Sequence, residues 1–208
     1  MMNSRIFITW MLVVLSLSGC SLIEQNIRPS TDVYTLSPTL EIESKHKVKH
    51  AVILAMSPIR SSRGLMSSDI IYQEEQYQYN SYAYSQWSDS PARLLEIVLQ
   101  QHLSYSSYLS AVIPSETLSH ADVLLEATLL DFSHHIQRDK SSTGRVSIRV
   151  YLIDANTKTV FATKEFSAER VAKPLNAQGA VLAINLATKQ VVEELNSWIE
   201  GSISQKLK

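Results

Sequence analysis

The chain has 208 residues, of which 45% are hydrophobic and 19% charged, and its formal charge is −1 at pH 7. This balance gives no strong positive field for binding nucleic acid or an anionic bilayer. One cysteine excludes an internal disulfide and a multi-thiolate zinc site, and the five glycines form no phosphate-binding motif. The length fits a single domain with a full core.

The first twenty residues have the pattern of a lipoprotein signal peptide. Arg5 precedes an apolar run over residues 6–15, which is far shorter than the roughly 20 residues of a spanning helix. Leu17-Ser18-Gly19-Cys20 follows and resembles the bacterial lipobox. We therefore expect cleavage before Cys20 and acylation of its thiol. A plain signal peptide with a coincidental cysteine and an uncleaved signal anchor are the alternatives.

Lipidation at Cys20 would divide the chain into a signal peptide (1–19), a lipidated tether (20–32) and one domain (33–208). Loss of Arg5 leaves 18 basic against 20 acidic residues, a charge of −2. Several acyl chains, at about 0.8 kcal/mol per buried CH₂, would anchor the protein permanently in a membrane. Ser21 follows the cysteine where, by resemblance to enterobacterial sorting, Asp would retain the protein in the inner membrane. We expect the outer membrane, with the domain facing the periplasm, and keep the inner membrane as the alternative.

Hydrophobic patterning predicts strands followed by helices in a definite order. A helix is expected to begin at Pro91 with Ser90 as its cap, and a long helix to run from Asn176 to about Lys206. The expected strands lie at 33–36, 51–56, 70–72 and 77–79 (a hairpin or two edge strands), 110–114, 122–132, 144–152 and 159–168. This order predicts an α+β two-layer sandwich, with a mixed, mainly antiparallel sheet covered on one face by two helices.

No arrangement of residues in the sequence points to catalysis, a metal or a cofactor. His134 and His135 are adjacent in an expected strand, so their side chains should point to opposite faces. His46 and His50 are four residues apart, but no carboxylate stands in register with them. Neither G-x-S-x-G nor H-E-x-x-H occurs. We expect a non-catalytic protein that needs no cofactor.

The segment between residues 70 and 87 is rich in aromatic residues. No basic residue lies between Arg63 and Arg93, which disfavours stacking on nucleic acid. One interpretation is an exposed hairpin with aromatic cross-strand pairs. The other is a contact surface for a partner protein, because tyrosine supplies a large amphipathic area. The candidate partner-binding residues are Tyr72, Tyr77, Tyr79, Tyr82, Tyr84 and Trp87.

Several short motifs, in this order and spacing, resemble the ABC-type transport auxiliary lipoproteins. They are the lipobox, Tyr34-Thr35-Leu36, Ile71-Tyr72, Tyr82 with Trp87 before Pro91-Ala92-Arg93-Leu94-Leu95, Ala121-Asp122-Val123-Leu124-Leu125, and a long C-terminal helix that ends near Trp198. The resemblance covers nearly all of residues 33–200. One departure is Gln73, which stands where a basic residue often follows the tyrosine.

The resemblance implies an accessory to a lipid transport system built around MCE-domain proteins, with an ABC permease and ATPase in the inner membrane. The lipoprotein would supply an outer-membrane docking point, and its aromatic hairpin would contact an MCE protein or another copy of itself. The family offers no catalytic residues. Two alternatives remain: an envelope lipoprotein that activates cell-wall synthesis or outer-membrane assembly, and an envelope hydrolase with an unrecognised site.

Overall fold

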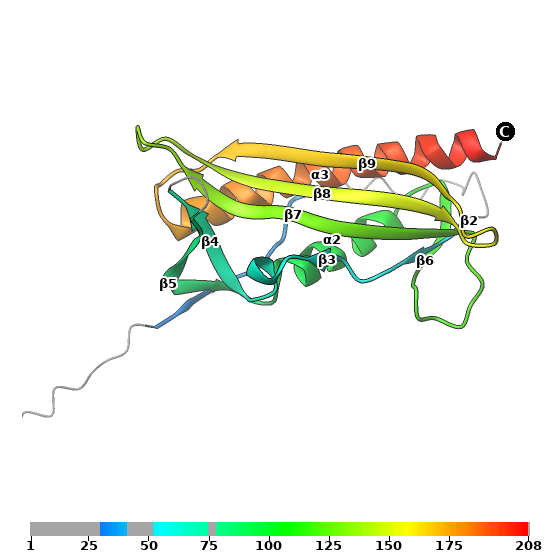
Figure 1. Cartoon of the computed structure of the whole chain (residues 1–208), viewed down its shortest axis with the longest axis horizontal. Helices are drawn as coiled ribbons and strands as arrows, with labels where there is room; N and C mark the ends of the chain where they lie inside the picture. The colour runs from blue at the N-terminus through cyan, green and yellow to red at the C-terminus, as the bar shows by residue number, and fades with distance from the viewer. Residues whose placement is uncertain (1–29, 41–51, 75–77, 208) are drawn as a thin grey trace, which may run out of the picture. The chain divides into compact units, whose positions relative to one another are not determined.

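The computed structural model describes residues 30–40, 52–74 and 78–207. The chain divides after Ser30, and all its described strands and helices belong to the compact unit Thr31–Lys208. Figure 1 shows its strands and helices, which in chain order are β1 (Asp32–Tyr34), β2 (Val52–Met56), β3 (Arg60–Ser61), the 3₁₀ turn η1 (Arg63–Leu65), β4 (Asp69–Gln73), β5 (Asn80–Trp87), α2 (Pro91–Ser104), β6 (Leu109–Pro114), β7 (Val123–Ile136), β8 (Ser142–Asp154), β9 (Val160–Val171) and α3 (Ala177–Lys206).

One mixed sheet contains all nine described strands, and β7 is its central strand. Along one side, β7 pairs in parallel with β2, β3 and β4 at successive places along its length. Along its other side it pairs with β8, which in turn pairs with β9, both antiparallel. Beyond β4 lie β5 and then β1, and beyond β2 lies β6. The long strands β7, β8 and β9 therefore form the body of the sheet, to which the shorter strands are added.

The expectation of a mainly antiparallel sheet is wrong, because five of the eight strand pairings are parallel. The three antiparallel pairings, β4–β5, β7–β8 and β8–β9, join strands that follow one another in the chain. Every other pairing joins strands that are separated by further elements, such as β2 and β6 with α2 between them. Such crossover connections bring strands side by side in the same direction. The α+β class with two helices is confirmed.

Both helices lie behind the sheet in Figure 1, and their apolar residues join those of the sheet in one core. Val146, Ile148, Val150 and Leu152 of β8 are fully buried, as their alternation predicts. Opposite them, α3 buries residues such as Ile184, Val191 and Leu195. The close approach is possible because Gly144 has no side chain: a Cβ there would lie 2.7 Å from the Ile184 backbone N and 2.8 Å from the Ala183 Cβ.

The two helices begin where their capping residues predict. Ser90 is the N-cap of α2 and Pro91 its first residue, although the Ser90 side chain makes no capping hydrogen bond. Asn176 caps α3 fully, since its Oδ1 accepts a hydrogen bond from the Gly179 N–H at 3.0 Å. Within the described residues, no helix is both long and apolar enough to cross a membrane.

Candidate functional site

The tyrosine-rich segment forms β4 and β5, and the structure divides its aromatic residues between the two faces of the sheet. Tyr82 packs against the core, half-buried Tyr72 contacts the Tyr82 ring, and Trp87 is a core residue with only 1% of its surface exposed. Tyr79 and Tyr84 are 63% and 59% exposed. Tyr77 lies outside the described residues. Among the candidate partner-binding residues that the structure describes, only Tyr79 and Tyr84 are therefore mostly exposed to solvent.

An irregularity between β4 and β5 places both exposed tyrosines on the same face. In a regular strand, Tyr79 and Tyr84 would point to opposite faces, because they are five residues apart. The pairing shifts register here, since Asp69 stands opposite Gln86 but Ile71 stands opposite Ser81. Such a bulge changes which residues face the core. Tyr82 and Trp87 therefore both point inward, and Tyr79 and Tyr84 both point outward.

We define the exposed tyrosine surface by Val33, Tyr79, Tyr84 and Leu130. Val33 pairs with Gln86 from the edge strand β1 and is 59% exposed. Tyr79 and Leu130 line a small pocket of about 40 Å³ together with Leu65, Ile71 and Asp131. Exposed aromatic and aliphatic side chains of this kind are common in protein–protein contact sites.

Behind this surface, a buried tyrosine–histidine pair joins β5 to the central strand. The Tyr82 hydroxyl lies 2.8 Å from Nδ1 of His134, and the Tyr72 and Tyr82 rings are 4.9 Å apart. Burial raises the pKa of Tyr82 to about 12 and lowers the pKa of His134 to about 4. Both groups are therefore neutral at pH 7, so the tyrosine hydroxyl donates and the imidazole nitrogen accepts. The pair fixes β5 against β7 and leaves His134 Nε2 without a partner among the described residues.

Trp87 supports the same region from the core. Its ring meets Phe132 of β7 edge-on, with the ring centres 5.4 Å apart. Because it is buried, Trp87 supports the exposed tyrosine surface from behind. Replacing Trp87 would therefore destabilise the core directly, and it would weaken the binding of a partner only as a consequence.

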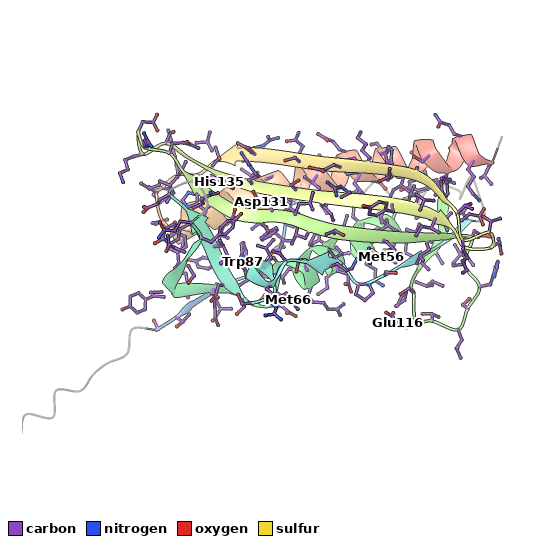
Figure 2. The ribbon with its side chains drawn as sticks, in the orientation of Figure 1. Met56, Met66, Trp87, Glu116, Asp131 and His135 are labelled. Carbon is purple, nitrogen blue, oxygen red and sulfur yellow. The ribbon has the colours of Figure 1, made fainter. Side chains whose placement is uncertain are left out.

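On the opposite face of β7, Asp131, Ser133 and His135 form a polar group that invites comparison with a catalytic triad (Figure 2). His135 Nε2 lies 3.0 Å from both the Ser133 hydroxyl and the Asp131 carboxylate. In a triad, the serine and the carboxylate bind different ring nitrogens, so that one proton can be relayed. Here both meet the same nitrogen, and Ser133 is fully buried. This geometry fits a structural network, in which Arg145 also approaches Asp131 at 3.9 Å.

The remaining sequence candidates give no site in the described part of the chain. His134 and His135 point to opposite faces, as their adjacency predicts, toward Tyr82 and toward Asp131. No group of three or more His, Cys, Asp or Glu residues that could hold a metal occurs in residues 30–40, 52–74 and 78–207. His46, His50, Cys20 and the lipobox residues Leu17, Ser18 and Gly19 lie outside these ranges.

Comparison with known proteins gives a family and a fold. The family model described as ABC-type transport auxiliary lipoprotein component matches residues 34–196. No curated protein matches the chain.

Solved structures share the fold at low sequence identity. The chain is similar to a Xanthomonas campestris protein of family DUF330, at 16% identity and a TM-score of 0.75, over 84% of this chain and 98% of that one. An uncharacterized protein matches at 15% identity and a TM-score of 0.63, over 82% and 99% of the two chains. A hypothetical protein from Chlamydia trachomatis matches at 12% identity and a TM-score of 0.51, over 74% and 98%.

Proposed function

Because the chain belongs to the family of ABC-type transport auxiliary lipoprotein components, we propose that it is a non-catalytic docking module for an MCE-domain protein of an ABC-type lipid transporter. The family model spans residues 34–196, which include α2, the first two thirds of α3 and every strand from β2 to β9. This match is the observation that carries the proposal. The permease, the ATPase and the MCE protein would be separate chains, and the ATP would be used by the ATPase.

The proposed anchor is the acylated thiol of Cys20. Leu17, Ser18 and Gly19 complete the lipobox, and the tether runs to residue 32, where β1 begins. A dozen residues span at most about 43 Å when fully extended. The domain would thus stay within a few tens of ångströms of its membrane. Ser21 favours the outer membrane, with the domain in the periplasm.

The proposed contact with the MCE protein is the exposed tyrosine surface. Its two tyrosines remain largely exposed, whereas Tyr82 and Trp87 of the same segment pack into the core. Tyrosine side chains lose little conformational entropy when they bind, and they dominate the binding energy of many interfaces. The core packing below holds their strand in place, which lowers the entropic cost of binding further.

Affinity purification of the full-length lipidated protein from detergent-solubilised membranes tests this function. The MCE protein encoded beside it should co-purify, together with the permease and ATPase under mild detergent. Recovery of peptidoglycan synthases or outer-membrane β-barrel assembly proteins in place of an MCE protein would contradict the proposal.

A further inference from the structure

The strand β9 forms one outer edge of the sheet along its whole length. It pairs with β8 and with no other described strand. It contains 12 residues and neither Pro nor Gly, whereas the outer strands β1 and β6 contain three and six residues. Edge strands that natural proteins leave without a partner are usually short, bulged, or interrupted by proline. β9 has one register shift, at Phe161, and the regular stretch after it, residues 162–171, is long for an unused edge.

The register between β8 and β9 shows which backbone groups point away from the sheet. Ala172 donates its backbone N–H to the Ser142 carbonyl oxygen at 2.9 Å, in line with the pairing of Val171 with Thr143. In an antiparallel pair, hydrogen-bonded positions alternate with positions whose N–H and C=O point outward. The odd-numbered residues of β9 therefore point these groups outward. They are Thr163, Glu165, Ser167, Glu169 and Val171, because the register shifts at Phe161 and the alternation ends there.

Three of the four charged side chains of β9 are held away from this edge. Glu165 binds Arg149 of β8 at 3.0 Å, and Glu169 forms an ion pair with Arg145 of β8. Lys164 extends over the Phe166 ring, 4.9 Å from its centre. Unpaired lysines that project along an edge oppose strand addition. Here these three charges are engaged on the faces of the sheet, which leaves the backbone groups of Thr163, Glu165 and Ser167 accessible. The Arg170 guanidinium donates a hydrogen bond to the Glu169 carbonyl oxygen at 2.9 Å, and an added strand would have to displace it.

A shallow groove, wide open to solvent, lies between Lys164 of β9 and the adjoining surface of α3. It has a volume of about 570 Å³ and is lined by Lys164, Glu193, Glu194, Ser197 and Trp198. The Trp198 ring packs edge-on against Phe166 at 5.5 Å. A strand added to β9 would place every second side chain over this groove, where Trp198 offers an apolar surface.

We propose that β9 is a strand-addition site for an extended segment of another protein, which carries Lys or Arg four residues apart, opposite Glu165 and Glu169. Main-chain hydrogen bonds to the odd-numbered residues would give the affinity, and the side-chain pattern would give the specificity. Opposite charges in facing positions of a sheet stabilise the pairing, and like charges weaken it. That the partner is the MCE protein rests on the proposed function; the strand-addition site itself does not.

A second copy of the chain fits this edge less well. Antiparallel pairing of β9 with β9 of another copy can be drawn in several registers. Consider the registers in which at least three quarters of the strand is paired. In each of them Glu165 or Glu169 lies directly or diagonally opposite a glutamate of the other copy. Both arrangements are close enough for repulsion. The two glutamates therefore favour a basic segment from a different protein.

A proline substitution tests the edge without removing a bond to β8. In Ser167→Pro the outward N–H is lost and the ring obstructs an added strand, while the bonds from even-numbered residues to β8 remain. Ser167→Ala keeps the N–H and is the matched control. The probe is the peptide Thr-Val-Lys-Val-Thr-Val-Lys-Val-Thr, titrated against the full-length lipidated protein in detergent, with binding read from fluorescence anisotropy.

The peptide should bind the wild type and Ser167→Ala equally, and Ser167→Pro at least about tenfold more weakly. Replacing both its lysines by glutamate should weaken binding to the wild type by about tenfold. This peptide comparison decides the question even if Ser167→Pro does not fold. The inference would be overturned if the wild type bound the lysine and the glutamate peptides equally well. It would also be overturned if the lysine peptide bound equally well to the wild type, Ser167→Ala and Ser167→Pro. A dimer that Ser167→Pro abolishes would overturn the choice of partner. Failure of the MCE protein to bind would refute the proposed function alone.

Discussion

At Gly144 the backbone of β8 touches α3, and this contact admits no side chain. A Cβ at this position would lie within 3 Å of both Ala183 and Ile184. We expect Gly144→Ala to lower the free energy of unfolding by about 1–3 kcal/mol, because helix and sheet must separate. The midpoint of urea denaturation measures the change.

Gly201 provides the matched control for this prediction. It lies in α3, and a Cβ there would meet nothing within 4 Å. Alanine is favoured over glycine within helices, so Gly201→Ala should stabilise the protein by about 0.5–1 kcal/mol. Equal effects at both positions would show that the close contact at Gly144 does not exist.

The buried His134 predicts a dependence of stability on pH. Its pKa is about 4 in the folded protein, against 6.5 for an unperturbed histidine, because burial disfavours the charged ring. Between pH 6.5 and 4 the unfolded chain thus binds more protons at this residue. Stability should fall as the pH falls through this range, by up to about 3 kcal/mol from His134.

Substitution of His134 isolates this contribution. His134→Asn offers an acceptor to Tyr82 but cannot take up a proton, so the loss of stability between pH 6.5 and 4 should become smaller than in the wild type. His120 is exposed, and His120→Asn is the matched substitution of a histidine outside the core. Urea denaturation at half-unit pH intervals gives the comparison, and parallel profiles for the wild type and His134→Asn would refute it.

At the scale of the element, the two helices differ in how they are capped. The Asn176 side chain binds the Gly179 N–H, whereas the Ser90 side chain binds no backbone group of α2. Asn176→Ala should therefore lower stability by about 1 kcal/mol. Ser90→Ala should change it much less. Thermal unfolding, monitored by circular dichroism, compares the two losses of stability. A larger loss for Ser90→Ala than for Asn176→Ala would contradict this prediction.

Local sequence signals were sufficient for most elements but not for how they combine. Ser90-Pro91 and Asn176 mark where α2 and α3 begin, and the alternation from Val146 to Leu152 identifies the buried face of β8. These features depend on neighbouring residues only. The parallel pairing of β2 with β6 and β7 depends on contacts between distant segments, for which the sequence has no periodic signal.

The candidate site shows the same limit within a single strand. The concentration of tyrosines predicted an aromatic hairpin, but not which tyrosines are exposed. That depends on the register shift that sets Gln86 opposite Asp69 and Ser81 opposite Ile71. Between these two pairs β4 advances two residues and β5 advances five, and because an odd number of extra residues reverses the faces of a strand, period-two patterning fails across this bulge. Tyr79 and Tyr84 could not have been separated from Tyr82 and Trp87 by spacing alone.

For the whole molecule, attachment to the membrane should depend on one thiol. We expect Cys20→Ala to abolish incorporation of radiolabelled palmitate, because this is the only cysteine in the chain. Ser21→Ala keeps the thiol and should remain labelled. Palmitate incorporation that survives Cys20→Ala would contradict lipidation at this residue.

We propose above that the MCE protein binds at the exposed tyrosine surface. The affinity of variants of this surface for the MCE protein tests that binding most directly. The double substitution Tyr79→Ala and Tyr84→Ala should weaken binding of the full-length lipidated protein by at least about 2 kcal/mol, or roughly 30-fold, with little change in thermal stability. Tyr105→Ala, at the end of α2, removes another exposed tyrosine and should bind as the wild type does. Unchanged affinity of the double variant, measured by surface plasmon resonance, would contradict the account.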